Sequence, residues 1–486
     1  MNRSVCKTNT FAVRMNYSRI TKFFAAPIFS DIRFWIVLYF VIRLFHITQP
    51  PLEIAHNWRQ CTGLMVSRNF YEEDPNIFYP RVDMAGDKTG ITGTEFPLFN
   101  YLIYLIAKIF GWADWYGRLI NLLVSSFGIY WFYKILKKYF NRRMAFYASF
   151  VLLNSLWFAY SRKTMPDTFS LALVLGALYF GLNYLFDGRR WQLLLFSIFG
   201  FCGIMSKIPA GYLFVVLVLP FLSRDIPFVR KFFMTVVFAI IMIPVVWWYF
   251  IWVPYLVKEF GFWHYYMGTS MRIGAQEIAS HSGQAFEKFY FAALNYIGFS
   301  LCIGGLILSI IKNQKRLLWV TGLCSAAFLV FILKAGFAFY HHNYYIMPFV
   351  PVMAMLVGYL LSEIKKPVFR NLLAFAIACE VILNALPEFR INNDQRYKLG
   401  LEPLVSKYVG KHDLIAINCG PNPQQIYLAH RKGWNLEDSG QVNVSYLDKI
   451  KSKGCKVLII NKHESYAPLL PYTVIFRNDD FVLYKL

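Results

Sequence analysis

The sequence has few charged residues. Only 16% of its 486 residues are charged, while 57% are apolar and 19% are aromatic. A soluble domain is about 45–50% apolar. The apolar residues of this chain lie in repeated stretches of roughly 15 to 25, the length that crosses a bilayer as a helix. The composition therefore excludes an ordinary soluble protein and predicts a polytopic helical membrane protein.

Several sequence patterns are also missing. There is no GxGxxG or Walker pattern to support nucleotide binding, and the eight cysteines form no CxxC pair and no zinc spacing. The basic N-terminus has no small-residue cleavage site, so we expect the first span to remain as an anchor. The net charge of +23 does not indicate nucleic acid, because Lys and Arg of membrane proteins gather in cytoplasmic loops and face anionic lipids. Membrane lipids are therefore expected partners.

The apolar stretches predict about eleven transmembrane helices. They lie near residues 33–47, 119–136, 144–160, 168–186, 191–205, 210–222, 232–254, 289–311, 317–333, 344–361 and 369–386. The stretch 96–110 is also apolar, but it is short, has Pro97 at its start and carries Lys108. We expect it to be a helix that lies in the membrane interface.

Basic residues predict the orientation, because they favour the cytoplasmic side. The N-terminal segment and every second connection between the predicted spans are basic. The N-terminus is therefore expected in the cytoplasm and the tail, after an odd number of spans, outside it. That tail alternates strand-like and helix-like segments. We predict an all-α transmembrane catalytic domain over 1–391, with a first outer loop at about 48–117, and a small extracytoplasmic α/β domain over 392–486.

The unusual polar residues gather on the predicted outer side. The first outer loop contains PPLEIAHNWRQ, and later outer connections contain SRKTMPD, SKIP and YHHNYY. Each residue has an ordinary structural explanation: Arg59 and Lys207 can anchor to headgroups, and Glu95 and Asp167 can be favourable charges at helix N-termini. Ionisable groups at the membrane are costly unless they are paired or used. Their collection on one side therefore predicts a site at the membrane surface.

Sugar transfer from a lipid-phosphate donor fits these residue types. It needs a carboxylate or imidazole to deprotonate the acceptor hydroxyl. It also needs cations, or a metal, to stabilise the departing phosphate. Arg can donate two parallel hydrogen bonds to a phosphate, and Lys can place a single positive charge beside it.

The order of these motifs resembles that of the GT-C glycosyltransferases. The resemblance is to the bacterial branch grouped with protein O-mannosyltransferases and the lipid A aminoarabinose transferase, and it covers roughly residues 33–361. It is carried by HNWRQCTGLMVSRNF, GTEFPLFNYLIYLIAKIFG, GRLINLL, SRKTMPD, SKIP and HNYYIMPFVP. It implies a GT-C fold with juxtamembrane helices in the first outer loop.

The resemblance also implies roles for individual residues. Glu95 and Asp167 look like the acidic residues of the family's first and second outer loops, which would order the acceptor or hold a divalent cation such as Mg or Mn. The donor phosphate is expected at Arg59, Lys207, Tyr344 and Tyr345. The wider donor and acceptor pocket is expected at Asn57, Arg81, Asp83, Arg162, His341 and His342.

One departure from the family pattern concerns the catalytic base. The family usually has an Asp just after the first span, where this chain has His56 and Asn57, with Glu53 three residues before. Either Glu53 or His56 can take the role, and Asp83 is a third candidate. The sequence leaves these alternatives open.

The sequence thus predicts an inverting glycosyltransferase that uses a polyprenyl-phosphate sugar at the outer face of a bacterial inner membrane. The acceptor would be an envelope glycan, lipid or protein. Two alternatives remain: a transporter or flippase of lipid-linked sugars, and a catalytically inactive envelope scaffold. A transporter would be expected to carry charges at the bilayer midplane and internal repeats, and neither is evident in the sequence.

Overall fold

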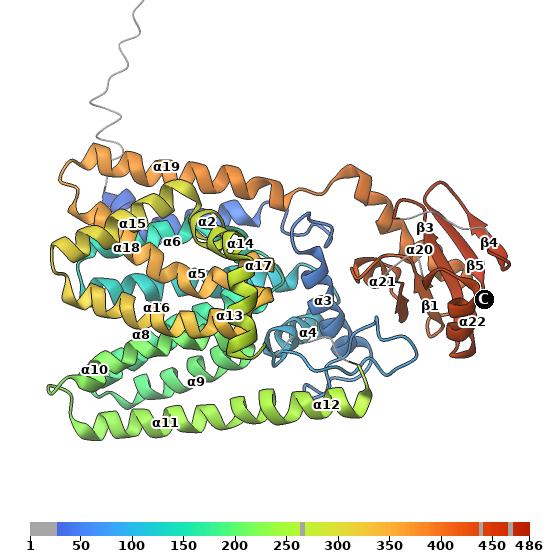
Figure 1. The fold of residues 1–486 in the computed structure, drawn as a ribbon, viewed down its shortest axis with the longest axis horizontal. Coiled ribbons are helices and arrows are strands. Elements are labelled where there is room, and N and C mark those ends of the chain that lie inside the picture. The colour runs from blue at the N-terminus through green and yellow to red at the C-terminus, as the bar shows by residue number, and fades with distance from the viewer. Residues whose placement is uncertain (1–26, 263–267, 437–440, 465–469) are drawn as a thin grey trace, which may run out of the picture.

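The computed structural model describes residues 27–262, 268–436, 441–464 and 470–486. Figure 1 shows a bundle of long helices at one end, a small sheet at the other, and the helices α3 and α4 between them. The basic N-terminal segment, from which the cytoplasmic N-terminus was predicted, lies outside the described residues.

Helices make up the bundle and the segment beside it. They are η1 (Pro27–Ser30), α2 (Ile32–Leu44), α3 (Asn57–Glu72), α4 (Leu98–Phe110), α5 (Tyr116–Tyr139), α6 (Arg142–Leu153), α7 (Leu156–Tyr160), α8 (Pro166–Asp187), α9 (Arg190–Ser206), η2 (Ile208–Leu217), α10 (Val218–Leu222), α11 (Phe228–Trp247), η3 (Trp248–Trp252), α12 (Val253–Phe260), α13 (Met271–Ser280), α14 (Ser282–Glu287), η4 (Lys288–Ala293), α15 (Asn295–Ile311), α16 (Lys315–Ala335), α17 (Phe337–His341), η5 (Asn343–Phe349), α18 (Val350–Glu363), α19 (Pro367–Ala385) and η6 (Leu386–Phe389).

The structure confirms a multi-pass helical membrane protein. Among the described residues, six helices are long and apolar enough to cross a membrane, or seven if one bent pair forms a single span. The prediction of about eleven spans is not confirmed. Several of the predicted spans are shorter helices, such as α2 with 13 residues, or helices that break.

Two predicted spans are broken where the sequence suggested continuous helices. The stretch 144–160 is interrupted at Asn154, and Ser155 begins α7 by accepting a hydrogen bond from the backbone N–H of Trp157. The stretch 289–311 is bent by 96° after the π-helical turn η4. Glu380 of α19 accepts hydrogen bonds from the N–H groups of Tyr296 and Ile297, and so satisfies the start of α15.

The apolar stretch 96–110 forms α4, as predicted. Its Phe99, Ile103 and Ala107 are buried, whereas Ile109 and Phe110 are exposed. This one-sided burial suits a helix that lies along a surface. Its position in the membrane interface stays a prediction.

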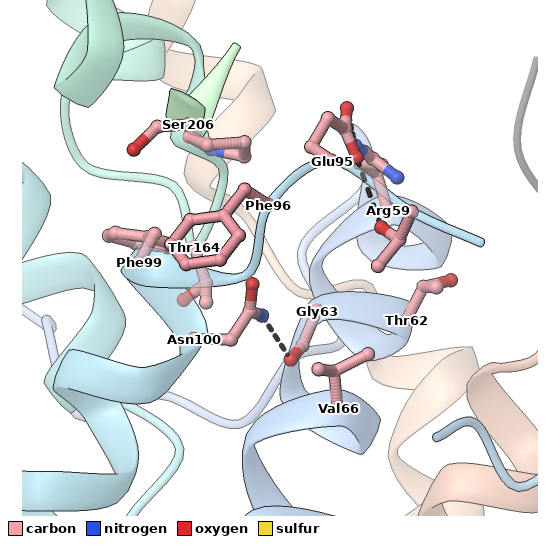
Figure 2. A pocket seen from close by; sticks show the side chains of 12 residues that line it. Arg59, Thr62, Gly63, Val66, Glu95, Phe96, Phe99, Asn100, Thr164 and Ser206 are labelled. Atoms are coloured by element: carbon pink, nitrogen blue, oxygen red, sulfur yellow. Dashed lines mark hydrogen bonds and ion pairs between the residues drawn. The ribbon is translucent and has the colours of Figure 1, made fainter. Parts of the chain in front are cut away.

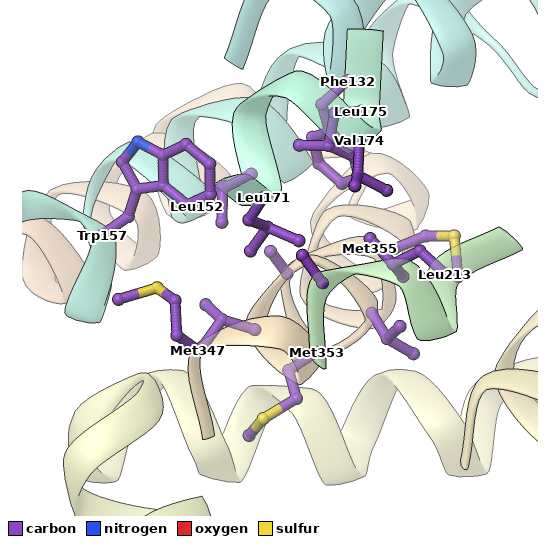
Figure 3. Close-up of a cluster of buried hydrophobic side chains, with 14 of the residues drawn as sticks. Phe132, Leu152, Trp157, Leu171, Val174, Leu175, Leu213, Met347, Met353 and Met355 are labelled. Atoms are coloured by element: carbon purple, nitrogen blue, oxygen red, sulfur yellow. The ribbon is translucent and has the colours of Figure 1, made fainter. Parts of the chain in front are cut away.

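The core of the bundle surrounds α8, which is buried along most of its length. Figure 3 shows Leu171, Val174 and Leu175 of α8 among apolar side chains from neighbouring helices. Small residues allow two close helix approaches: a Cβ on Gly128 of α5 would lie 2.6 Å from that of Ala172, and one on Gly358 of α18 would lie 2.5 Å from that of Ala148. Such contacts are typical of helix packing within membranes.

The C-terminal part is α/β, as predicted. Its strands are β1 (Leu414–Ile417), β2 (Gly433–Asn435), β3 (Cys455–Asn461), β4 (Thr473–Arg477) and β5 (Phe481–Lys485), in the order β2-β1-β3-β5-β4. Strands β1, β2 and β3 are parallel, and β5 is antiparallel to β3 and β4. The accompanying helices are η7 (Asn393–Gly400), α20 (Leu401–Tyr408), α21 (Gln424–Ala429) and α22 (Val444–Ser452). The division near residue 391 stays a prediction.

Candidate active site

Four charged side chains from four different segments meet at the end of the bundle beside α3 and α4. Arg59, in the first turns of α3, donates to Glu95, which lies just before α4. The Nζ of Lys207, between α9 and η2, lies 3.7 Å from Oε1 of Glu95. The same Nζ lies 2.6 Å from Oδ1 of Asp167, in the first turn of α8. We call Arg59, Glu95, Asp167 and Lys207 the ion-pair cluster.

The contacts of Glu95 and Asp167 can be compared with the simpler explanation that each is only a charge at the start of a helix. The residues at the N-terminal boundaries of α8 and α4 are Met165 and Pro97, and neither helix has a side-chain cap. The carboxylates of Asp167 and Glu95 instead contact Lys207, whose side chain is only 14% exposed. The Oδ2 atom of Asp167 has no hydrogen-bond partner among the described residues. Both carboxylates therefore contribute to the cluster, and Asp167 also lies in the first turn of α8, where a negative charge is favourable.

The charges of the cluster balance and stabilise one another. Burial alone would raise the pKa of Glu95, but the positive charges of Arg59 and Lys207 outweigh it and lower the pKa to about 2. Burial would lower the pKa of Arg59, and Glu95 more than offsets this, so the guanidinium stays charged. Both carboxylates are paired with cations, and the cluster as a whole has no net charge.

A row of aromatic rings borders the cluster. We call its members, His56, His342, Tyr344 and Tyr345, the aromatic wall. The Nζ of Lys207 lies 4.9 Å from the ring centre of Tyr344, which in turn is 5.5 Å from the ring of His56. His342 stacks on Tyr344 at 5.1 Å and on Tyr345 at 5.9 Å. The motifs HNWRQ, SKIP and HHNYY, far apart in the sequence, are thus brought together.

His56 occupies a distinctive position at the start of α3. Its backbone is left-handed, with φ 58°, and its Nε2 forms a hydrogen bond with the hydroxyl of Tyr160. The Nζ of Lys163 donates to the carbonyl of Ala55, the residue before His56, at 3.2 Å. Burial, with smaller effects from Lys163 and His342, lowers the pKa of His56 to about 3. The imidazole is therefore neutral at neutral pH.

Glu53 lies apart from the cluster and faces the interior. It is 0% exposed, with Arg118 at 3.6 Å and Arg162 at 4.0 Å from its Oε1. Gln60 donates to its other oxygen at 3.4 Å. A carboxylate without exposed surface, held by two guanidinium groups, cannot contact an acceptor hydroxyl unless the structure rearranges.

Other predicted pocket residues are engaged elsewhere. Arg81 pairs with Asp74 at 2.9 Å, and Asp83 pairs with Arg68 at 2.9 Å. Arg162 donates to the carbonyl of His46. These contacts keep Arg81, Asp83 and Arg162 away from the ion-pair cluster.

Asn57 lies where the C-terminal part approaches the cluster. It accepts a hydrogen bond from Asn422, in the loop after β1, at 3.1 Å. Gln424, the first residue of α21, donates to the carbonyl of Pro51 at 2.9 Å. The loop after β1 therefore forms part of the surroundings of the site.

His341 is exposed and lies against His342.

Sequence reasoning missed Tyr160, which comes directly before SRKTMPD and contacts His56. It also missed Lys288, which donates to Asn343 beside the paired histidines. No pattern in the sequence connects either residue with the site, because both contacts join segments that are far apart in the chain.

A small pocket lies beside the cluster. Figure 2 shows Arg59 and Glu95 joined at its edge, with Phe96, Phe99 and Asn100 below them. Its volume is about 30 Å³, which is room for about two water molecules. A sugar ring does not fit without movement of the surrounding segments.

Lys207 contacts one oxygen of each carboxylate, Oε1 of Glu95 and Oδ1 of Asp167, so a divalent cation bound through these two oxygens would compete with its ammonium. Across the described part of the chain, no three His, Cys, Asp or Glu residues gather as a metal site.

Comparisons with known proteins find one matching family model and several similar structures. Residues 94–248, which include Glu95, Asp167 and Lys207, match the family model of dolichyl-phosphate-mannose-protein mannosyltransferases. No curated protein matches the sequence. The crystal structure of ArnT from Cupriavidus metallidurans bound to undecaprenyl phosphate is similar over 93% of this chain and 97% of that chain, with a TM-score of 0.60 and 14% identity.

The chain has the GT-C fold. A second similar structure is the oligosaccharyltransferase of Archaeoglobus fulgidus in the apo form, with a TM-score of 0.54 and 13% identity over 88% of this chain and 70% of that chain. The same enzyme, AglB, in complex with an inhibitory peptide and a dolichol-phosphate has a TM-score of 0.50 and 12% identity, over 88% of this chain and 69% of that chain. The resemblance to the O-mannosyltransferase and aminoarabinose transferase branch, predicted from the motifs, is confirmed.

Proposed function

We propose that this GT-C protein is an inverting glycosyltransferase that uses a polyprenyl-phosphate sugar. The observation that carries the proposal is the ion-pair cluster beside His56 and Tyr344. The proposal is supported by the match of residues 94–248, which contain Glu95, Asp167 and Lys207, to the mannosyltransferase family model. Further support comes from structural likeness to ArnT bound to undecaprenyl phosphate and to AglB in complex with a dolichol-phosphate.

The reaction is a single displacement at the anomeric carbon. The acceptor oxygen forms a bond to that carbon as the bond from the carbon to the phosphate oxygen breaks, and the configuration inverts. The acceptor proton passes to a base, and the electron pair of the broken bond stays on polyprenyl phosphate. Arg59 and Lys207 face the developing negative charge once phosphate enters, because charged donors fixed in advance stabilise it without reorganisation.

We assign the role of base to His56 rather than to Glu53. His56 borders the cluster through Tyr344, and its Nδ1 makes no hydrogen bond to any residue that the structure describes. In the tautomer whose Nε2–H donates to Tyr160, Nδ1 is the atom that accepts the proton. Glu53 is enclosed by Arg118 and Arg162. We derive no step through Mg or Mn, because Lys207 occupies the place between the two carboxylates.

The proposed location is the outer face of a bacterial inner membrane, with the N-terminus in the cytoplasm. The acceptor is an envelope glycan, lipid or protein. The loop after β1, which contacts Asn57, and the start of α21, which contacts Pro51, support a role of the C-terminal domain in acceptor access. A transporter of lipid-linked sugars and an inactive envelope scaffold are the alternatives that the test must exclude.

The test is release of polyprenyl phosphate by purified protein from a panel of polyprenyl-phosphate sugars, with membrane extract as acceptor. Wild type is compared with His56→Gln and Glu53→Gln, with and without chelator. We expect release by wild type that survives chelation, and a loss of about 10²–10⁴ in His56→Gln, as for a missing general base. No release from any donor by folded protein that binds the lipid would favour the transporter or the scaffold.

A further inference from the structure

The ion-pair cluster alone leaves an entering phosphate without a spare cation. Arg59 and Lys207 are each engaged with a carboxylate. A phosphate that approaches them also approaches Glu95 and Asp167, whose negative charges repel it. Binding of an anion here therefore calls for positive charge from outside the cluster.

Lys288 supplies a buried cation on the other side of the aromatic wall. The residue is only 7% exposed, and its Nζ donates to Oδ1 of Asn343 at 2.7 Å. No carboxylate of the described residues lies within ion-pair distance of it. A buried ammonium bonded to a neutral amide is costly in the absence of an anion.

The backbone around Lys288 is irregular. It begins the π-helical turn η4, which precedes the 96° bend into α15. Such turns are frequent at functional sites. The turn brings Lys288 to Asn343, next to the histidines of α17.

His342 connects Lys288 with the ion-pair cluster. It stacks on Tyr344, which Lys207 also faces. Burial lowers the pKa of His342 to about 4, and the positive charges of Lys207, Arg59 and Lys288 contribute to the shift after that of His341. The positive charges of all three residues therefore act on one imidazole. Asn343 and His341 are exposed, so an anion can reach this side from the surface.

An apolar surface lies on the same segment. Phe286 of α14 and Tyr296 of α15 are each 56% exposed. Both rings contact Tyr290, at 5.5 Å and 5.8 Å between ring centres. Exposed aromatic rings on this segment suit contact with the hydrocarbon chain of a lipid phosphate.

We propose that Lys288 binds the phosphate of the polyprenyl donor, between His342 and the exposed rings of Phe286 and Tyr296. Phosphate enters beside Lys288 and lies next to Arg59 and Lys207, which remain paired with their carboxylates. This inference rests on the proposed function, and it names a phosphate ligand outside the motifs that predicted the site. Lys288 then stabilises the donor before reaction and the phosphate product after it.

A purely structural role for Lys288 would be to hold Asn343 in place. Two variants separate the roles. Lys288→Gln keeps a donor for Asn343 but removes the charge, whereas Asn343→Ala keeps the charge but removes the amide. Lys334→Met is the matched control, because Lys334 is an exposed lysine at the end of α16.

The experiment measures binding of undecaprenyl phosphate and of uncharged undecaprenol to purified full-length protein. We expect wild type to prefer the phosphate. Lys288→Gln should bind it about tenfold or more weakly, as for loss of a charge-assisted contact, and should lose the preference over undecaprenol. Asn343→Ala and Lys334→Met should stay within about threefold of wild type.

Unchanged phosphate binding in Lys288→Gln, or an equal loss in Asn343→Ala, would overturn the inference and leave the proposed function intact. Failure of wild type to bind any polyprenyl phosphate would overturn the proposed function as well. If Lys288→Gln does not fold, Lys288→Arg provides the second measurement: charge and donors are kept, so weakened phosphate binding in the folded variant would count against the inference.

Discussion

The Nζ of Lys207 lies 2.6 Å from Oδ1 of Asp167 and ties the start of η2 to the first turn of α8. The same nitrogen is 3.7 Å from Glu95, which also accepts from Arg59. Two carboxylates and two cations from four segments of the chain are thus held together. Loss of either acid leaves a largely buried positive charge without its partner.

Glu95→Gln should lower kcat/KM by about 10²–10³, because it frees both cations from the positions that the carboxylate fixes. It should also lower the thermal stability. The release of polyprenyl phosphate and thermal unfolding in detergent measure the two effects. Glu73→Gln is the matched control, because Glu73 forms a partly exposed pair with Lys432 outside the cluster, and such pairs contribute about 0–1 kcal/mol.

The double variant Glu95→Gln with Arg59→Met separates stability from activity. It removes both members of the Arg59–Glu95 pair and leaves Lys207 paired with Asp167, so stability should return towards that of wild type while activity stays low. Full activity in Glu95→Gln would show that the cluster has only a structural role.

Acid should destabilise the protein through His56. Its pKa is lowered by burial from 6.5 to about 3, so between these values the unfolded chain binds a proton that the folded chain does not. The free energy of unfolding therefore falls as the pH falls through this window, by up to about 1.4 kcal/mol per pH unit. Thermal unfolding of wild type and His56→Gln between pH 7 and pH 4 measures it.

The curve of His56→Gln should be flatter than that of wild type but not flat. His342 retains its own contribution, because burial lowers its pKa to about 4. Parallel curves for wild type and His56→Gln would contradict the assignment of a buried neutral imidazole at position 56.

The sequence was sufficient to predict the class, most helices and the segments that form the site. Apolar length identifies spans such as α5 and α8, because only a helix satisfies its own backbone in lipid. Ionisable residues at helix ends identified Arg59, Glu95, Asp167 and Lys207. These features depend on residue type and local order, which a single sequence contains.

Pairing between distant segments was not predictable. Glu53 and His56 are three residues apart, and only the structure shows that Glu53 lies beside Arg118 and Arg162 while His56 contacts Tyr160 and Tyr344. The bend before α15 is likewise invisible in an apolar stretch, because Glu380 of another helix caps it. Asp83 was expected in the pocket, and the structure pairs it with Arg68.

Asp83→Asn tests that placement. The pair with Arg68 is nearly buried, and Arg68 also donates to the carbonyl of Tyr427 in α21 and lies over its ring at 4.2 Å. Breaking such a pair costs about 3–5 kcal/mol, so the C-terminal part should loosen from α3. Hydrogen exchange of β2 measures this, since the N–H of Gly433 donates to the carbonyl of Asp83.

Asp87→Asn is the control for Asp83→Asn. Asp87 pairs across the same contact with Lys453 at 3.3 Å, but both side chains are largely exposed. Its loss should change little. A drop in donor affinity in Asp83→Asn without any change in exchange would instead place Asp83 in the donor pocket.

Glu380→Gln should weaken the start of α15. The two carboxylate oxygens of Glu380 accept from the N–H groups of Tyr296 and Ile297 at 3.2 Å and 2.9 Å. A Gln side chain has one acceptor oxygen and no charge for the helix N-terminus, so the free energy of unfolding should fall by about 1–2 kcal/mol. Glu363→Gln, which removes an exposed pair with Lys312, should have a smaller effect.

Because the bend places Lys288 beside Asn343, Glu380→Gln should also weaken binding of undecaprenyl phosphate, whereas Glu363→Gln should not. Equal stability and equal lipid binding in both variants would show that the bend does not depend on Glu380.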